Sequence, residues 1–291
     1  MLLVELIKTL RPHQWVKNLF VLAPLIFAEQ AASQVSVQTS LAAFGIFSLL
    51  SGCVYILNDI VDVEADRQHP TKCRRPIPSG SLSLAHARVL LVTLLAGALS
   101  WAFVLAPGLG AIGLGYFTLN VGYSFSFKHI PFLDVGVIAT GFILRIYGGA
   151  VAIDVPLSLW LVLCTYLLAT FLALGKRKHE LHFAQNVGAS ARRVLARYNA
   201  DYIQVAMRLL AVATFLAYGA YALYGQTMAS FDPRDLVWSL PFVAFGLFRF
   251  DGMTRKVHDG RSPTDLMLRD FVFVLNLACW MAVVVYTIYG R

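Results

Sequence analysis

The sequence predicts an all-α membrane protein, a bundle of helices that crosses the bilayer many times. Of its 291 residues, 58% are hydrophobic and only 14% are charged, whereas a soluble domain typically carries about 25% charged residues. The mean hydropathy is +0.67. Apolar runs recur at close to the roughly 20 residues that a helix needs to cross the hydrocarbon core. The runs do not alternate apolar and polar residues as the strands of a β-barrel do, so we expect helices.

Nine apolar runs are long enough to be candidate spans. They cover about residues 17–32, 39–57, 86–106, 108–126, 132–152, 157–175, 202–224, 235–250 and 271–289. The fourth run is weakened by its Gly residues and the eighth by its length. We therefore expect a bundle of nine transmembrane helices that forms a single domain over residues 1–291.

The basic residues predict which side of the membrane each loop faces, because cytoplasmic loops are enriched in Lys and Arg. In the nine-span arrangement, 21 of the 24 Lys and Arg residues are assigned to the same side of the membrane. The exceptions are Arg145, which lies within a span, and Arg234 and Arg291, which lie on the opposite side. We expect a multi-pass protein of the inner (plasma) membrane, with its N-terminus in the cytoplasm and its C-terminus outside. The net charge of +8 then reflects insertion and contact with anionic lipids as well as any function.

An acidic stretch follows the second predicted span. In LNDIVDVEADRQHP, residues 57–70, Asp59, Asp62 and Asp66 stand at i, i+3 and i+7. On a continuous helix this spacing places the three carboxylates on one face over about two turns. Such like charges are costly unless a cation neutralises them, and Mg²⁺ binds through carboxylates plus substrate phosphates. We expect these aspartates to hold Mg²⁺ beside Asn58; the alternative is a solvated helix end.

The stretch NDIVDVEAD resembles the NDxxDxxxD motif of the UbiA superfamily of intramembrane prenyltransferases, with Asn58, Asp59, Asp62 and Asp66 at the motif positions. The resemblance implies a UbiA-like nine-helix bundle with a cytoplasmic active-site cavity, a Mg²⁺-bound diphosphate substrate and a lateral opening to lipid. Members with prenyl diphosphate donors carry a second acidic motif after the sixth helix. Here the corresponding loop reads LALGKRKHELHF, with Glu180 as its one acid, which argues against prenylation of an aromatic acceptor.

Four segments resemble the decaprenyl-phosphate phosphoribosyltransferases of that superfamily in order and spacing: RPHQWVKN, NDIVDVEAD, KHIPFLDVGVIATGFILR and FLALGKRKHEL. The resemblance implies transfer of 5-phosphoribose from phosphoribosyl pyrophosphate (PRPP) to a polyprenyl phosphate such as decaprenyl phosphate, in the synthesis of arabinan precursors for the cell envelope. The acceptor phosphate is already anionic, so we expect no catalytic histidine. Two alternatives stay open: a prenyltransferase acting from a prenyl diphosphate on a small acceptor, and a transporter for an anionic solute.

The predicted site combines the carboxylates with basic side chains. Lys128 joins the three aspartates as a catalytic residue, and Lys17 and Tyr123 are assigned with it to the PRPP phosphates. A mobile lid over the 5-phosphate consists of Arg67, Lys72, Arg74 and Arg75. The acceptor phosphate or the pyrophosphate is assigned to Arg145, Lys176 and Arg177, and the substrate-binding set is completed by Asn58, Asp134 and Glu180. Two alternatives remain. The loop cations can reflect only the enrichment of Lys and Arg in cytoplasmic loops, and Arg145 can pair with a buried acid such as Asp134.

The expected partners are PRPP, a polyprenyl phosphate and the bilayer, with no nucleic acid; homo-oligomer formation stays open. In the last cytoplasmic loop, residues 248–270, we expect Arg249, Asp265 and Asp270 either to stabilise the loop or to contact substrate.

Overall fold

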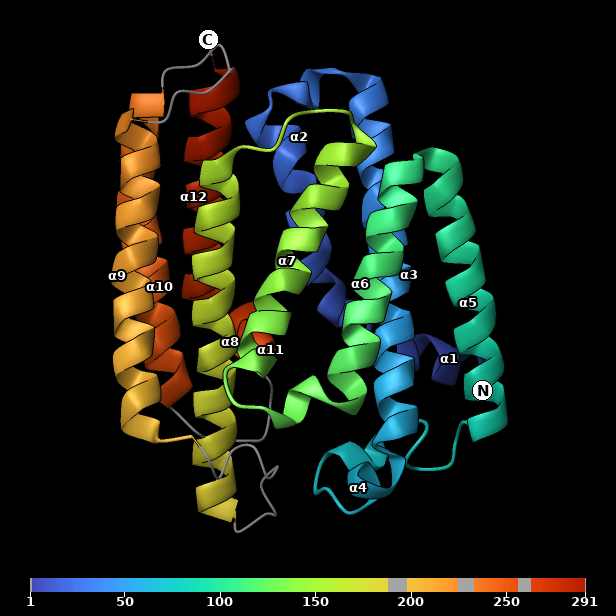
Figure 1. Cartoon of the computed structure of the whole chain (residues 1–291). Coiled ribbons are helices and arrows are strands. Elements are labelled where there is room, and N and C mark those ends of the chain that lie inside the picture. Colours follow the sequence, from blue (N-terminus) through green and yellow to red (C-terminus); the bar gives the residue numbers. More distant parts are fainter. Residues whose placement is uncertain (1, 188–197, 225–232, 256–262, 291) are drawn as a thin grey trace. The chain divides into compact units, whose positions relative to one another are not determined.

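The structure is a computed structural model that describes residues 2–187, 198–224, 233–255 and 263–290 (Figure 1). All regular elements in these residues are helices, and seven segments are long and apolar enough to cross a membrane. These are Gln34–Val61 (α3), Leu84–Leu105 (α5), Leu133–Ala152 (α7), Leu159–His182 (within α8), Ala200–Tyr224 (α9), Asp235–Arg255 (ending in α10) and Phe271–Tyr289 (α12). The other elements are α1 (Leu2–Leu10), η1 (Pro12–Leu22), α2 (Ala23–Phe27), η2 (Gln30–Ala32), α4 (Val63–Arg67), η3 (Lys72–Arg74), α6 (Pro107–Phe125), η4 (Phe127–His129), η6 (Pro233–Ser239) and α11 (Pro263–Arg269).

The all-helical, polytopic class is confirmed, whereas the count of nine spans is not. The first predicted span, residues 17–32, is not one helix: the 3-10 helix η1 gives way to the short helix α2, and Glu29 adopts a left-handed φ of 56° before η2. Pro24 is the second residue of α2, a position where its missing N–H removes no helical hydrogen bond. The fourth predicted span is the 19-residue helix α6, whose Gly, Asn and Tyr residues dilute its apolar character.

The chain divides into two compact units, and the first comprises Met1–Leu25, Gln30–Lys128 and Leu144–Pro156. At its centre α3 packs against α1, η1, α5 and α6. Phe47 and Leu50 of α3 are fully buried in its core. Gly149 of α7 lies so close to η1 that a Cβ there would collide with the Val21 carbonyl oxygen. This packing positions η1 and the ends of α3 and α6, which carry the acidic stretch and its partners.

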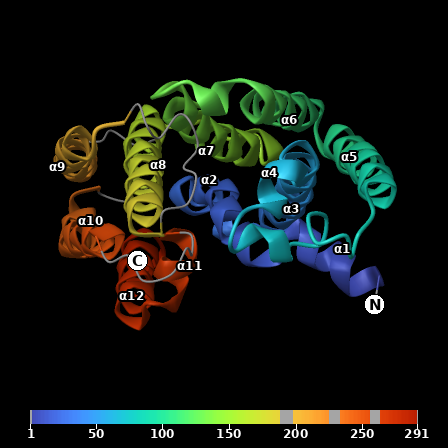
Figure 2. The ribbon, with the colours of Figure 1, turned by 90° about the horizontal axis from the view of Figure 1, so that it is seen from below.

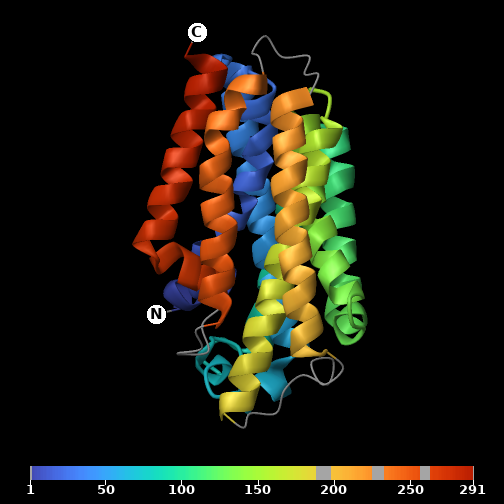
Figure 3. The same cartoon turned by 90° about the vertical axis from the view of Figure 1, so that its left-hand side faces the viewer.

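The second unit comprises Ile26–Glu29, His129–Ile143 and Leu157–Arg291. Within it α8 (Leu159–Val187) packs against α9 and α10 (Leu240–Arg255). Helix α10 also packs against α12, and Figure 3 shows these two helices side by side. The basic stretch that we expected as a loop after residue 175 is instead a continuation of α8. Its Lys, Arg, Glu and Leu residues are good helix formers, and buried Leu181 extends the apolar packing of the helix. The single domain over residues 1–291 stays a prediction.

Candidate active site

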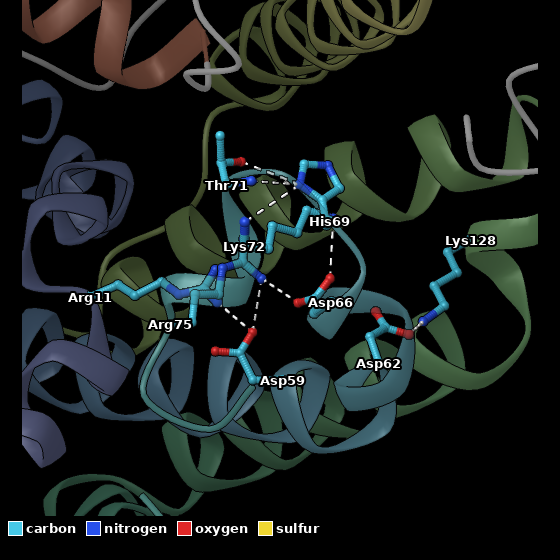
Figure 4. Close-up of polar contacts among 9 residues, drawn as sticks. All are labelled: Arg11, Asp59, Asp62, Asp66, His69, Thr71, Lys72, Arg75 and Lys128. Atoms are coloured by element: carbon cyan, nitrogen blue, oxygen red, sulfur yellow. Dashed lines mark hydrogen bonds and ion pairs between the residues drawn. The ribbon is translucent and has the colours of Figure 1, made fainter. Parts of the chain in front are cut away.

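The last turn of α3 and the short helix α4 position the three aspartates. Figure 1 shows α4 directly after the end of α3, and Figure 2 shows this end from below. The two helices meet at Asp62, whose φ of −96° and ψ of 11° interrupt the regular helix. The expectation that all three carboxylates share one helix face is therefore wrong. Asp59 and Asp66 turn toward Arg75, whereas Asp62 turns toward Lys128 (Figure 4).

Arg75 bridges two of the carboxylates. Its Nη1 lies 3.0 Å from Asp59 Oδ1 and 2.7 Å from Asp66 Oδ2. Arg11 Nη2 adds a second cation 2.5 Å from Asp59 Oδ1, and Lys72 Nζ lies 3.4 Å from Asp66 Oδ1. Both carboxylates are almost completely buried, at 1% and 4% exposure. Buried carboxylates require such compensation, and here three cations surround two of them.

The cations of this cluster also act on one another. Burial first, and then the charge of Arg11, lower the pKa of the Arg75 guanidinium, while the charges of Asp59 and Asp66 oppose that shift. Three positive charges therefore surround two negative charges, one more than is required to neutralise the carboxylates. An anion with several charges, such as a diphosphate, would relieve this repulsion.

Asp62 has its own cation. Lys128 Nζ lies 2.5 Å from Asp62 Oδ1, and Lys128, on η4, is only 6% exposed. Next to this ion pair Ser124 of α6 donates its hydroxyl to Asn58 Oδ1 at 2.8 Å. The motif asparagine therefore fixes the end of α3 against the end of α6, from which η4 follows.

The predicted lid, between α4 and α5, lies against the carboxylates. Ile77 and Leu82 are buried and anchor it, and Gly80 adopts a left-handed φ of 82° that an L side chain rarely takes. Arg67 pairs with Glu64 at 2.8 Å, and its Nε donates to the Pro78 carbonyl at 3.4 Å.

In the segment between α4 and α5, Lys72 faces the carboxylates and Arg74 does not. His69 Nδ1 accepts the Thr71 N–H at 3.3 Å and the Lys72 N–H at 3.4 Å, which shapes the turn that presents Lys72 to the carboxylates. Arg74, by contrast, is exposed. The segment therefore brings two of the four predicted lid cations, Lys72 and Arg75, to the carboxylates.

Arg145 lies in α7 and is only 6% exposed. Its Nε donates to Asn18 Oδ1 at 2.7 Å, and its Nη2 donates to the Tyr116 hydroxyl at 2.8 Å and to Ser51 Oγ at 3.3 Å. The guanidinium carbon also lies 4.8 Å from the centroid of the Tyr116 ring, within range of a cation–π interaction. These neutral partners belong to η1, α6 and α3, so Arg145 links four elements of its unit.

Lys17 and Tyr123 of the same unit were assigned to the PRPP phosphates. Lys17 Nζ donates to Gln14 Oε1 at 2.6 Å, one turn earlier in η1. Tyr123 is partly buried near the end of α6. The assignment of both residues to the PRPP phosphates stays a prediction.

The acid proposed as the alternative partner of Arg145 has other partners. Asp134 Oδ2 lies 2.8 Å from Arg177 Nε, both residues are fully buried, and the Tyr198 hydroxyl donates to Asp134 Oδ1 at 2.6 Å. Arg177 Nη1 also pairs with Glu180. Burial first, and then the hydrogen bond to Asp134, raise the pKa of Tyr198. Three predicted substrate-binding residues of the second unit thus form a network in which Asp134 and Arg177 are buried and Glu180 is partly exposed, as is Lys176 beside them.

The last predicted loop contains a second structural ion pair. Arg249 Nη2 lies 2.8 Å from Asp270 Oδ2, and Asp270 caps α12 by accepting the Phe273 N–H at 2.8 Å. These interactions favour the loop-stabilising alternative for both residues. Residues 256–262 of this loop, and Arg291, lie outside the described part of the chain.

Arg11 is the site residue that sequence reasoning missed, although its segment RPHQWVKN was singled out. It separates α1 from η1 with a left-handed φ of 51°, and its guanidinium lies 5.0 Å from the centroid of the Tyr55 ring. A non-glycine residue in this conformation costs on the order of 1 kcal/mol and is typical of functional positions. Its place before Pro12 could have indicated a turn from the local sequence. Its contact with Asp59, 48 residues away, could not have been predicted from local sequence.

The donor chemistry of the aspartates decides whether they suit a metal ion. Among the described residues no group of three or more His, Cys, Asp or Glu side chains is arranged to hold a metal. Asp59 Oδ2 is nevertheless buried and, within the described chain, accepts no hydrogen bond. Asp59 and Asp66 both point at one nitrogen of Arg75, and they offer the hard oxygen ligands that Mg²⁺ prefers. The residues therefore fit Mg²⁺ held by two carboxylates, with Asp62 at a neighbouring position.

The model of the UbiA prenyltransferase family matches residues 19–264. The chain belongs to this family. Two relatives named decaprenyl-phosphate phosphoribosyltransferase match nearly the whole chain. The one from Mycobacterium tuberculosis is 34% identical over 97% of this chain and 94% of its own length. The one from Corynebacterium glutamicum is 33% identical over 98% of this chain and 86% of its own length.

The fold is also that of solved UbiA proteins. A UbiA homologue from Archaeoglobus fulgidus, bound to DMAPP and Mg²⁺, superposes with a TM-score of 0.72 at 18% identity, over 99% of this chain and 100% of that chain. This UbiA family member is therefore an enzyme, a transferase, and a multi-pass membrane protein.

Proposed function

We propose that the enzyme transfers 5-phosphoribose from PRPP to a polyprenyl phosphate such as decaprenyl phosphate, in a Mg²⁺-dependent reaction that releases pyrophosphate. The observation that carries this proposal is the set of four cations, Arg11, Lys72, Arg75 and Lys128, arranged around the motif aspartates. PRPP carries a diphosphate and a separate 5-phosphate, so it needs more cationic partners than a prenyl diphosphate does. The relatives' names support the same reaction.

The carboxylates of Asp59 and Asp66, with Asp62 beside them, would hold Mg²⁺. When bound, the ion would neutralise charge on the pyrophosphate and so favour its departure. Asn58, held by Ser124, fixes the backbone on which these carboxylates lie. Lys128 is close enough to Asp62 to serve the same diphosphate, and we assign it the role of neutralising charge that develops on the leaving group.

In the transfer itself, the bond between carbon 1 of the ribose and the pyrophosphate oxygen breaks, and its electron pair leaves with the pyrophosphate. An oxygen of the lipid phosphate forms the new bond to carbon 1. The acceptor is already an anion, so no protein base has to remove a proton. Because the lipid phosphate is a poor nucleophile in water, we expect the chain to hold it close to carbon 1.

For the acceptor phosphate we propose Lys176, the partly exposed cation of its stretch. Arg177 and Lys178 of the same stretch are buried, at 0% and 3% exposure, so they are less accessible to a lipid phosphate. This cationic stretch supplies no carboxylate cluster for a second metal-bound diphosphate, which argues against aromatic prenylation. We further propose the plasma membrane as the location, with the N-terminus and the acidic site in the cytoplasm and the C-terminus outside, and a role in supplying arabinan precursors.

The test is a transfer assay with purified protein, Mg²⁺, polyprenyl phosphate and labelled PRPP. We expect Mg²⁺-dependent label in the organic phase, and its loss in a variant carrying Asp59→Asn and Asp62→Asn. Turnover of a prenyl diphosphate with an aromatic acceptor, and none of PRPP, would overturn the proposal.

A further inference from the structure

Arg75 lies between the two carboxylates that we propose as metal ligands, Asp59 and Asp66. Its Nη1 lies within hydrogen-bonding distance of one oxygen of each carboxylate, at 3.0 and 2.7 Å. A Mg²⁺ ion bound by both residues would have to lie between the same two carboxylates, because its ligand distances are only about 2.0–2.1 Å. An ion held through the same two oxygens would compete with the guanidinium for this position.

We infer that Arg75 is a positioning residue that exchanges partners during donor binding. Without metal it neutralises Asp59 and Asp66; when metal and donor bind, it turns to the donor's phosphate. This inference rests on the proposed function and adds to it a coupling between the two ligands. Metal alone has to displace a favourable ion pair, whereas metal together with a diphosphate gives the displaced guanidinium a new anionic partner.

The backbone around Arg75 is held in place, while its side chain is partly exposed. Its N–H donates to the Lys72 carbonyl at 3.0 Å, and its carbonyl accepts the Ser79 N–H at 2.9 Å. Buried Ile77 anchors the following turn. The Arg75 side chain is 31% exposed, in contrast to 1% for Asp59. The exchange thus needs rotation of one side chain rather than opening of the whole segment.

The charges explain why the exchange would be coupled to the donor. Arg11, Lys72 and Arg75 already place three positive charges around the two carboxylates of Asp59 and Asp66. A divalent ion in place of the Arg75 guanidinium would raise the positive charge next to these two carboxylates from three to four, with the displaced guanidinium still nearby. Such an excess is unfavourable in a buried site unless a multivalent anion enters with the ion. A diphosphate supplies that charge.

The experiment compares Mn²⁺ binding, measured by electron paramagnetic resonance, in the wild type and in Arg75→Gln without any substrate. Removal of the competing guanidinium should tighten Mn²⁺ binding about tenfold or more. Arg75→Lys, which keeps the charge on a shorter side chain, should give a smaller increase. Arg88→Gln, at an exposed position on α5, makes the same change in net charge and should leave Mn²⁺ affinity unchanged.

A second measurement separates partner exchange from a purely structural role. Binding of labelled pyrophosphate in the presence of Mg²⁺ should be at least about tenfold weaker in Arg75→Gln, because the guanidinium that turns to the phosphate is missing. Opposite changes for metal and pyrophosphate are the signature of the exchange. A structural role would weaken both.

The outcomes distinguish this inference from the proposed function. If the wild type binds neither Mn²⁺ nor pyrophosphate with Mg²⁺, the proposed metal site fails. If Mn²⁺ binds and Asp59→Asn removes it, but Arg75→Gln leaves the affinity unchanged or lower, the inference is overturned and the proposed function stands. If Arg75→Gln does not fold, Arg75→Lys decides: an unchanged or lower Mn²⁺ affinity overturns the inference.

Discussion

Lys128 Nζ lies 2.5 Å from Asp62 Oδ1, and this ion pair stands apart from the two carboxylates that share Arg75. The break in the helix at Asp62 produces the separation, because it turns this side chain toward η4. The three acids of the motif therefore form two separate ion-paired groups, Asp59 and Asp66 with Arg75 and Asp62 with Lys128, rather than one face of three carboxylates. A substrate with two phosphate groups could engage the cations of both.

Replacement of Lys128 tests whether its charge is used in the reaction. We expect Lys128→Met to lower kcat for phosphoribosyl transfer about hundredfold, because a preorganised charged donor to the leaving group is lost. Lys128→Arg retains the charge and should keep much of the activity. Steady-state kcat and KM for PRPP measure both effects. Unchanged kcat in Lys128→Met would remove this residue from the catalytic set.

The Arg145 network should contribute mainly to stability. Arg145→Met removes the hydrogen bonds to Asn18, Ser51 and Tyr116, so we expect a loss of about 2–4 kcal/mol in the free energy of unfolding. Tyr116→Phe removes one hydroxyl and should cost about 1 kcal/mol. Tyr286→Phe, at a position that is 76% exposed, is the matched control. Denaturant unfolding in detergent micelles would detect the losses; equal stability of all three variants would contradict this assignment.

The buried pair of Asp134 and Arg177 gives a sharper test of structure against substrate binding. Asp134→Asn leaves the Arg177 charge buried beside fewer acids and should cost about 3–5 kcal/mol in the free energy of unfolding. The double variant Asp134→Leu, Arg177→Met should recover much of that loss, since an apolar pair needs no compensation. A single Arg177→Met variant with normal stability and a raised KM for either substrate would instead support the phosphate-binding role predicted from the sequence.

Metal removal should separate activity from stability. Chelation of Mg²⁺ should abolish transfer but change the melting temperature of the wild type little, because Arg75, Arg11 and Lys72 still neutralise the carboxylates. In Arg75→Gln the melting temperature should depend more strongly on Mg²⁺, because a ligand that binds the folded state more tightly stabilises it more. Differential scanning fluorimetry with and without EDTA measures both; a large loss in the chelated wild type would argue against internal compensation.

Features that depend on local pattern were predictable from the sequence. Length and apolar composition placed the seven helical segments of the described residues that are long and apolar enough to cross a membrane. The acidic motif was placed correctly at the end of the second predicted span, because its residues are adjacent in sequence. The first span and the loop after residue 175 were misjudged because hydropathy does not distinguish a 3-10 helix from an α-helix, nor an exposed loop from a polar helical extension.

The pairings within the site depend on tertiary structure and were less accessible. The approach of Arg11 to Asp59 requires the left-handed turn before Pro12, and the bridging position of Arg75 requires the segment between α4 and α5 to fold back. The sequence placed Arg145 in the membrane, but its neutral partners Asn18 and Tyr116 come from separate elements. The sequence alone identifies which side chains are cationic or acidic. It does not show which cation contacts which acid, because that depends on the folded structure.

The most direct test of the central claim follows two labels of PRPP through one reaction. Purified protein is incubated with Mg²⁺, polyprenyl phosphate and PRPP that carries ¹⁴C in the ribose and ³²P in the terminal phosphate of the diphosphate. We predict that the ¹⁴C moves to the organic phase while an equal amount of ³²P appears as aqueous pyrophosphate. Transfer of ³²P to the lipid, or retention of both labels in unreacted PRPP under conditions where a prenyl diphosphate is consumed, would contradict the account.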